Sequence, residues 1–203
     1  MEGIRREGAD GMQPSDEELV LALRDGDTDS LGVLVSRWQE PLYRFTVRIL
    51  SRPDDARDVC QETFLRVLRQ CGRFREGARF STWMYQIALN LCRDQMRRHR
   101  RWRWTPLVEA SPGEDAPAGH EEIVRDTPAD EAARQERREL VARALADLPP
   151  DQREVLVMKE FEGMKFREIA EILGCPESTV KSRMYYGLTG LRNALERRGV
   201  RSL

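Results

Sequence analysis

The chain has 203 residues, enough for one or two small domains, and its 34 Lys and Arg nearly balance its 35 Asp and Glu. It contains no apolar run long enough to span a membrane and no signal-peptide pattern, so we expect a soluble, cytoplasmic protein without membrane insertion of its own. Arginines dominate residues 93–103, whereas acids dominate residues 109–131. A near-neutral total therefore does not exclude a nucleic-acid partner, because the basic charge is concentrated in one segment.

The first helices follow a polar, glycine-rich segment, residues 1–14, which we expect to be a disordered tail. Ser15 with Glu18 three positions later forms the sequence pattern of a capping box and predicts a helix start. A second helix is expected from about Asp29 to Leu50, because its apolar residues recur with the helical period.

Two more helices complete the first half of the chain. Pro53 begins the third, and its inward positions are expected to be Ala56, Val59, Cys60, Phe64, Val67, Leu68 and Cys71. A loop over residues 72–79 leads into a fourth helix, roughly residues 81–102. No segment alternates as a strand would, so this half reads as a helical domain over residues 15–104.

Residues 105–131 change in character, with prolines, glycines and acids and few large apolar groups. Such a composition predicts a flexible acidic linker. Helical pattern resumes near Ala132, breaks at Pro149 and Pro150, and continues to about residue 198. The expected fold class is therefore all-α, with two small helical domains joined by that linker.

The second domain contains a helix-turn-helix pattern over residues 166–186. Gly174 stands where a left-handed turn is needed, and Pro176 is expected to open the second helix. The exposed face of that helix offers groups suited to base edges and phosphates, which favours a recognition helix over an ordinary amphipathic helix pair. The candidate residues are Pro176, Glu177, Ser178, Thr179, Lys181, Ser182 and Arg183.

A second candidate DNA surface lies around the loop before the fourth helix. Aromatic side chains beside arginines are typical of proteins that hold single-stranded DNA, because bases stack on rings while cations neutralise the backbone. Trp83 also fits a core position, since Trp83, Ile87 and Leu91 recur at four-residue spacing. The candidates are Phe74, Arg75, Arg79, Phe80, Trp83, Asn90, Asp94, Arg97, Arg98 and Arg101.

The cysteines and histidines offer no metal site in the sequence, since no CxxC pair and no histidine at ligand spacing is present. We interpret the four cysteines as buried thiols, with a redox pair of Cys60 and Cys71 as the less favoured alternative. His99 and His120 are expected to be solvated, and no cofactor is expected.

Two stretches carry a family resemblance. DDARDVCQETFLRVLRQ with FREGARFSTWMYQIALNLCRDQMRRHRR resembles region two of bacterial sigma-70 factors of the extracytoplasmic-function (ECF) group. LADLPPDQREVLVMKEFEGMKFREIAEILGCPESTVKSRM is similar to region four of the same group. Together they cover nearly all of the chain from Ser15 to about Leu195.

The resemblance implies partners and roles. Core RNA polymerase would bind the third helix through its clamp helices, at Arg57, Asp58, Gln61 and Glu62, and would bind the second domain through its flap. The loop from Phe74 to Phe80 would capture a flipped base of the promoter −10 element, and Asn90 with the following arginines would hold the melted strand. The recognition helix would read the −35 element, the acidic linker would thread the polymerase channel, and an anti-sigma factor would act as inhibitor.

The sequence also departs from the family. Tyr185, Tyr186, Gly187, Leu188 and Gly190 stand where many relatives continue with arginines. The two glycines could permit close packing against polymerase or an inhibitor, at about 1 kcal/mol of helix stability each.

The residues alone are also compatible with two other classes of protein. A stand-alone helix-turn-helix regulator would explain the second domain but not the first. A metal-dependent nuclease using Asp54, Asp55, Asp58 and Glu62 is less favoured, because no second acidic cluster or nucleophile accompanies them. We therefore expect a transcription initiation factor and not an enzyme.

Overall fold

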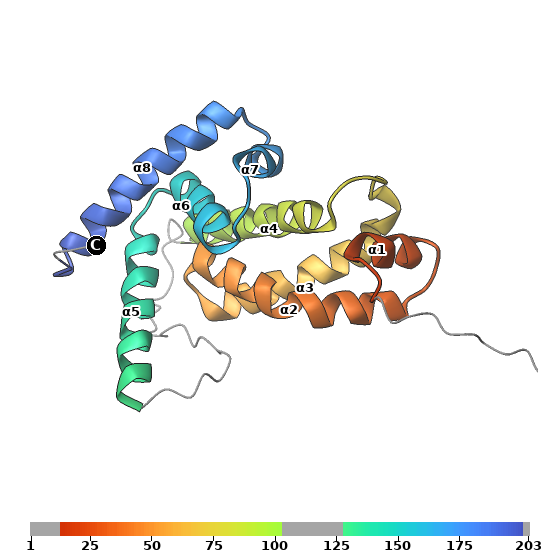
Figure 1. Ribbon diagram of the computed structural model, residues 1–203, viewed down its shortest axis with the longest axis horizontal. Coiled ribbons are helices and arrows are strands. Elements are labelled where there is room, and N and C mark those ends of the chain that lie inside the picture. The colour runs from red at the N-terminus through yellow and green to blue at the C-terminus, as the bar shows by residue number, and fades with distance from the viewer. Residues whose placement is uncertain (1–12, 103–127, 201–203) are drawn as a thin grey trace, which may run out of the picture.

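The computed structural model describes residues 13–102 and 128–200, and within these ranges every regular element is helical. The first domain consists of α1 (Asp16–Arg24), α2 (Asp29–Leu50), α3 (Pro53–Gln70) and α4 (Phe80–Trp102), with a 3-10 turn at Cys71–Arg73. The second consists of α5 (Pro128–Ala146), α6 (Pro150–Leu156), a π-helical turn at Val157–Phe161, α7 (Phe166–Leu173) and α8 (Glu177–Glu196). Figure 1 shows α8 crossing above α5 and α6, while α1 to α4 pack beside them. The all-α fold class is confirmed.

The start of α1 is the predicted capping box. The Ser15 backbone N–H donates to Glu18 Oε2 at 2.7 Å, and the Glu18 backbone N–H donates to Ser15 Oγ at 3.2 Å. Two N–H groups that have no partner within the helix are thereby satisfied. Leu19 and Leu23 then face the core, one turn apart.

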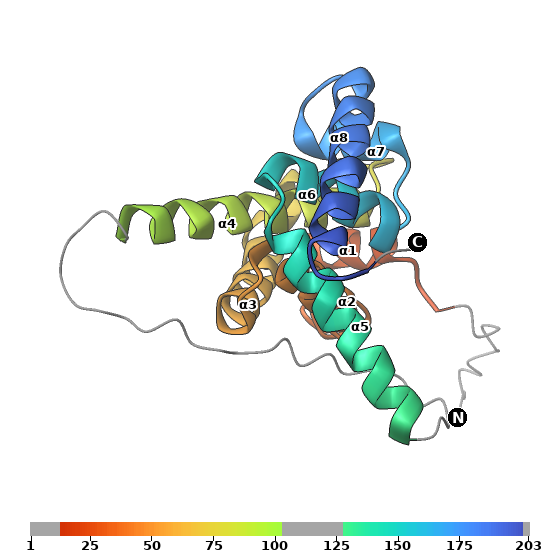
Figure 2. The ribbon, with the colours of Figure 1, turned by 90° about the vertical axis from the view of Figure 1, so that its left-hand side faces the viewer.

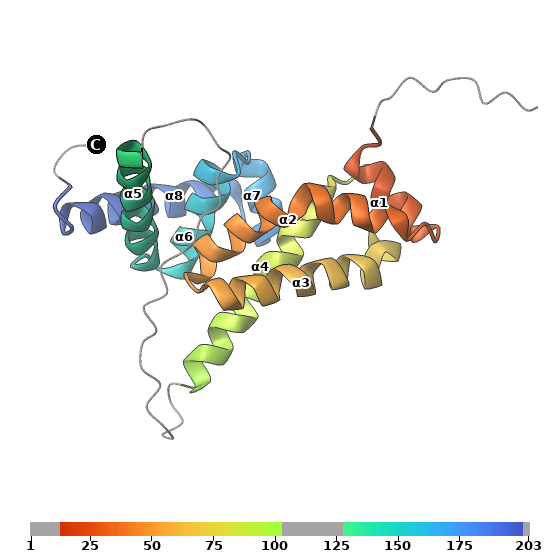
Figure 3. The ribbon, with the colours of Figure 1, turned by 90° about the horizontal axis from the view of Figure 1, so that it is seen from below.

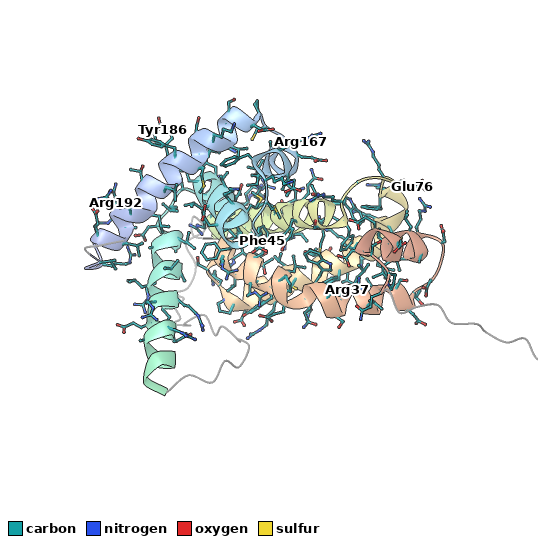
Figure 4. All side chains as sticks on the ribbon, in the orientation of Figure 1. Arg37, Phe45, Glu76, Arg167, Tyr186 and Arg192 are labelled. Carbon is teal, nitrogen blue, oxygen red and sulfur yellow. The ribbon has the colours of Figure 1, made fainter. Side chains whose placement is uncertain are left out.

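The centre of the first domain is the buried face of α2. Leu34, Leu42, Phe45 and Ile49 are almost fully inaccessible to solvent, at helical spacing. Figure 4 shows Phe45 in the interior, with other helices around it. The helix has the bounds predicted from its period, and its C-cap Ser51 takes a left-handed conformation with φ of 57°.

On α3, one inward position of the prediction is wrong. Ala56, Val59, Cys60 and Val67 are buried, but Leu68 is exposed. The apolar stripe of a helix covers only part of its circumference. Leu68 lies outside the edge of that stripe, although it follows the buried Val67 in the sequence.

The cysteines only partly match the expectation of buried thiols. Cys60 and Cys92 are buried, whereas Cys71 and Cys175 are half-buried. Cys60 and Cys71 are separated by three helical turns, about 16 Å along the axis, whereas a disulfide needs Cα atoms within about 7 Å. The alternative of a redox pair between them does not fit this geometry.

The helix-turn-helix forms where the sequence predicted it. Gly174 takes a left-handed conformation with φ of 63° and ends α7. Pro176 is the N-cap of α8 and not its first helical residue, because the helix begins at Glu177. Its carbonyl oxygen accepts the N–H groups of Thr179 and Val180 at 3.0 and 3.2 Å.

The glycines of α8 serve packing within the second domain, and nothing in the structure assigns them to an external partner. A Cβ on Gly190 would lie 2.7 Å from Leu148 Cδ2, and one on Gly187 would lie 3.0 Å from Leu156 Cδ1. Both approaches are tighter than ordinary Cβ contacts, so glycine at these positions lets α8 pack closely against α6 and the residues before it.

Helix α5 begins at Pro128, inside the segment predicted as linker. Proline is well tolerated at the first position of a helix, since its missing N–H would have no partner there. The rest of the predicted linker, residues 105–127, and the tail up to residue 12 lie outside the described residues.

The two domains share one hydrophobic core, which contains buried residues from both. Polar bonds also cross between them: Arg153 of α6, itself buried, donates from Nη1 to the carbonyl oxygen of Ile49 on α2 at 2.7 Å. The domains are therefore packed against each other in this arrangement.

Candidate nucleic-acid interface

The amino-terminal half of α8 presents a polar stripe to solvent. Ser178, Lys181 and Ser182 are exposed, while Val180 and Met184 are buried beneath them against the rest of the domain. Pro176 and Glu177 are also exposed at the start of the helix. This arrangement leaves the predicted recognition face free and fixes its orientation from the opposite side.

Two predicted recognition residues are less accessible. Thr179 and Arg183 are half-buried, and Arg183 pairs through Nε with Asp151 of α6 at 3.3 Å. Arg183 therefore also links α8 to α6. Beyond them, Tyr185, Tyr186 and Leu188 are exposed, and the two tyrosine rings meet edge to face at 5.5 Å. Figure 4 shows Tyr186 and Arg192 on the outer side of α8.

The carboxyl-terminal half of α4 projects beyond the helices around it (Figures 2 and 3). Asn90, Arg97, Arg98 and Arg101 are exposed along it, and the half-exposed Asp94 pairs with Arg97. Because the helix is uninterrupted to Trp102, it holds these groups on a rigid arm, which we call the α4 arm (residues 90–102).

In the loop before α4, the predicted cations have different environments. Arg75 is exposed. Arg79 is exposed as well, but its Nη1 lies 2.5 Å from Glu168 Oε1 on α7. In this arrangement one predicted −10 contact is therefore occupied by the helix-turn-helix.

The predicted role of Phe74 and Phe80 in base stacking is not supported. Both rings are buried, and the Phe80 ring lies 6.1 Å from Trp38 and 6.5 Å from Phe74 in edge-on geometry. Trp83 is half-buried against Phe74 at 5.4 Å. Aromatic rings in such a cluster stabilise the domain by excluding water and by edge-to-face attraction. We therefore assign Phe74 and Phe80 to the core that positions the loop.

A third surface is the outward face of α3. Arg57, Asp58 and Gln61 are exposed, and Glu62 is half-exposed beside Arg66 at 3.1 Å. Two leucines are exposed on the same helix: Leu65, which was not singled out in the sequence, and Leu68, which was expected to face inward. An exposed leucine among polar residues is common on its own, whereas two close together add apolar area to the candidate partner surface.

His99 is not a free, solvated side chain as the sequence suggested. Its Nε2 lies 2.8 Å from Asp55 Oδ2, and Gln95 Nε2 donates to Asp55 Oδ1 at 2.7 Å. Across residues 13–102 and 128–200, no group of three or more His, Cys, Asp or Glu side chains could hold a metal ion. In the same ranges, no helix is long and apolar enough to cross a membrane.

Ion pairs between the domains were not predicted from the sequence. Three carboxylates of the second domain, Glu154, Glu162 and Glu168, meet three arginines of the first, Arg93, Arg48 and Arg79. We call them the interdomain ion pairs. Their partners lie far apart in the chain, and each carboxylate reads in the sequence as an ordinary solvated position.

At one of these ion pairs, a tyrosine hydroxyl and a carboxyl group that can each lose a proton are hydrogen-bonded to each other. Tyr85 donates its hydroxyl to Glu162 Oε2 at 2.6 Å, and Arg48 lies 3.7 Å from the other oxygen. Burial raises the pKa of the Glu162 carboxyl and also the pKa of the Tyr85 hydroxyl. The hydrogen bond from Tyr85 and the charge of Arg48 act in the opposite direction on Glu162.

Comparison with known proteins identifies the family. The model for sigma-70 region 2 matches residues 34–102, and the model for sigma-70 region 4 matches residues 138–189. The chain is 31% identical to the ECF RNA polymerase sigma-E factor of Haemophilus influenzae over 184 residues, 91% of this chain and 97% of that protein. It is 30% identical to the RNA polymerase sigma-H factor of Pseudomonas aeruginosa over 91% of this chain and 95% of that one. The chain belongs to the ECF group of sigma-70 factors.

This sigma factor also resembles solved structures in fold. The structure of CnrH in complex with the cytosolic domain of CnrY has a TM-score of 0.64 at 24% identity, covering 90% of this chain and 97% of that one. The sigma factor RpoE of Bartonella quintana, solved in complex with the anti-sigma factor NepR, has a TM-score of 0.64 at 23% identity. It covers 81% of this chain and 96% of that one.

Membership of the ECF group determines the general function of the protein. Members of this family are DNA-binding transcription initiation factors, so the protein is an alternative sigma factor that acts with RNA polymerase in promoter recognition. Both family regions are present on one chain, and the alternative of a stand-alone regulator receives no support.

Proposed function

We propose that this sigma factor divides promoter recognition among three surfaces. The exposed stripe of Ser178, Lys181 and Ser182, with Pro176 and Glu177 at the helix start, reads the −35 element in the major groove. Thr179 and Arg183 support this contact from the edge of the stripe. The single observation that carries the proposal is the exposure of this stripe on a helix whose other side is buried.

The α4 arm takes the −10 element in this proposal. Asn90 and Asp94 face the melted strand, while Arg97, Arg98 and Arg101 neutralise the phosphates of the strand and of the adjoining duplex. Arg75 and Arg79 contribute from the loop, and Trp83 supports them from the edge of the aromatic cluster. The exposure of Asn90, Arg97, Arg98 and Arg101 along the arm supports this role, because DNA can reach these side chains from the solvent side of the helix.

Core polymerase binds the outward face of α3 in the same scheme. Arg57, Asp58, Gln61 and Glu62 supply polar contacts to the clamp helices of the largest subunit, and Leu65 adds apolar area. Interfaces commonly combine such a polar rim with a few apolar residues. The second domain binds the polymerase flap, and the protein acts in the cytoplasm together with polymerase.

An anti-sigma factor is the inhibitor we propose for this chain. Its support is that the Bartonella quintana sigma factor with the same fold was solved with an anti-sigma factor bound. Residues 15–104 and 132–198 serve as separate units on polymerase, so the packed arrangement of the domains has to open. Opening breaks the interdomain ion pairs and frees Arg79.

In-vitro transcription tests the proposal. The purified protein is added to bacterial core polymerase on supercoiled DNA carrying the region upstream of its own gene, and single-stranded bases around the start are probed chemically. New transcripts with a melted bubble are expected. Binding to this DNA without core polymerase and without melting would contradict the proposal.

A further inference from the structure

Two lysine side chains lie near the ring of Phe166, the first residue of α7. Lys159 comes from the π-helical turn before α7, and its Nζ lies 5.0 Å from the ring centroid. Lys181 comes from α8, and its Nζ lies 5.9 Å from the same centroid. Cation–π attraction operates within about 6 Å, so one ring attracts both ammonium groups. Three elements of the second domain therefore meet at Phe166.

The ring and one of the lysines are held by further contacts. Phe166 is half-buried and packs against the hydrophobic core, so the ring is fixed relative to α7. Lys159 Nζ also donates to the carbonyl oxygen of Met164 at 3.2 Å. A lysine loses much rotamer freedom when it binds a phosphate, and a lysine already restricted by a ring loses less.

The charge around the ring favours an anionic ligand. Within the described part of the chain, neither Lys159 nor Lys181 forms a salt bridge, whereas Arg183 on the same helix pairs with Asp151 at 3.3 Å. Lys181 is exposed and Lys159 is half-buried, and a phosphate beside either ammonium group offsets the repulsion between the two cations. The arrangement suits the DNA backbone beside the stripe on α8.

We propose that Phe166 is a positioning residue for promoter DNA, and that Lys159 is an additional phosphate contact. Phe166 holds Lys181 within the recognition stripe and holds Lys159 beside the same stretch of DNA backbone. This inference rests on the proposed role of α8 at the −35 element and adds two residues to it. Lys159 lies outside the helix-turn-helix, so its sequence position gives no sign of this role.

The test measures promoter binding by holoenzyme, made from the full chain and core polymerase, with a fluorescent duplex of the region upstream of its own gene. Affinity is measured over a series of salt concentrations. Phe166→Leu, which keeps an apolar side chain but removes the ring, is expected to weaken binding about two- to five-fold. Phe166→Tyr is expected to bind like the wild type. Lys159→Met is expected to weaken binding and to lower the salt slope by about one.

Three comparisons make the result decisive. Arg192→Met removes an exposed cation of α8 that pairs with Glu196, and it is expected to leave binding unchanged. Phe166→Leu is expected to cost less in a Lys181→Met background than in the wild type, because the ring then has one lysine fewer to position. Thermal unfolding and core polymerase binding are measured for each variant, and Lys159→Met decides the matter if Phe166→Leu fails to fold.

The outcomes separate this inference from the proposed function. Wild-type binding by both Phe166→Leu and Lys159→Met, with loss of binding in Lys181→Met, would overturn the inference and leave the role of α8 intact. Wild-type binding by Lys181→Met would instead overturn the role of α8 at the −35 element.

Discussion

Arg93 and Glu154 form a two-pronged ion pair that joins the two domains. Nε and Nη2 of Arg93, on α4, donate to the two carboxylate oxygens of Glu154, on α6, at 3.0 and 2.6 Å. The Glu154 side chain is 3% exposed, so its charge is compensated mainly by this arginine. The same bond raises the pKa of the Arg93 guanidinium. The helix that carries the α4 arm is thus anchored to the second domain.

We predict that Arg93→Ala loosens the packing of the two domains. Leaving a buried carboxylate without its partner costs about 3 kcal/mol, and solvent reaching the partly exposed arginine site lowers this figure. Small-angle X-ray scattering of the free protein is expected to show a larger radius of gyration for the variant. Arg192→Ala is the matched control, because it breaks an exposed pair with Glu196 within α8. Equal radii for wild type and Arg93→Ala would contradict the prediction.

The glycines of α8 give a stability prediction with an internal control. Gly190→Ala is expected to destabilise the protein by about 1–3 kcal/mol, since the new Cβ would overlap Leu148. Gly32→Ala, in the exposed first turn of α2 with no atom within 4 Å of the new Cβ, is expected to stabilise it by about 0.4–1 kcal/mol. Urea unfolding of both variants measures the two effects. A stabilised Gly190→Ala protein would show that α8 can shift away from Leu148 at little cost.

The division of labour between α8 and α3 predicts opposite phenotypes. Lys181→Ala is expected to weaken promoter binding by holoenzyme while leaving core polymerase affinity unchanged. Gln61→Ala with Glu62→Ala is expected to weaken core binding instead, because these side chains lie on the other domain, away from α8. Arg183→Ala makes a less clean test, since it also removes the pair with Asp151. Equal loss of both activities in either variant would argue against separate surfaces.

Alkylation of the cysteines should follow their burial. Burial raises the pKa of the Cys60 thiol to about 11 and raises that of Cys92 still further, so both stay protonated at pH 7. Only the thiolate reacts readily, and we expect iodoacetamide to label Cys71 and Cys175 first in the native protein. Labelling of Cys60 should rise only as the pH approaches 11 or on unfolding. Mass spectrometry of peptides from native protein at pH 7 and 9 checks this order.

Local sequence patterns predicted most of the helix bounds. Ser15 with Glu18 predicted the start of α1, and Gly174 predicted the end of α7, because each depends only on neighbouring backbone groups. The period of apolar residues gave the bounds of α2 for the same reason. The exposed stripe on α8 was also predictable, since a helix buried on one side exposes the other.

The predictions that failed concern contacts between parts of the chain that are distant in the sequence. Phe74 and Phe80 have the composition of a stacking site, but their ring cluster also depends on Trp38, which comes from α2. His99 looked isolated because Asp55, its partner, lies 44 positions away in the sequence. The interdomain ion pairs were missed for the same reason.

Glu168 uses its two carboxylate oxygens for different partners. Oε2 accepts the backbone N–H of Lys165 at 2.8 Å at the start of α7, while Oε1 pairs with Arg79 of the first domain at 2.5 Å. Separating the domains breaks only the second bond, so the first turn of α7 keeps its cap. The helix-turn-helix can therefore separate from the first domain without any local refolding at the start of α7. Separation of the domains would release Arg79 of the loop and leave the helix-turn-helix intact.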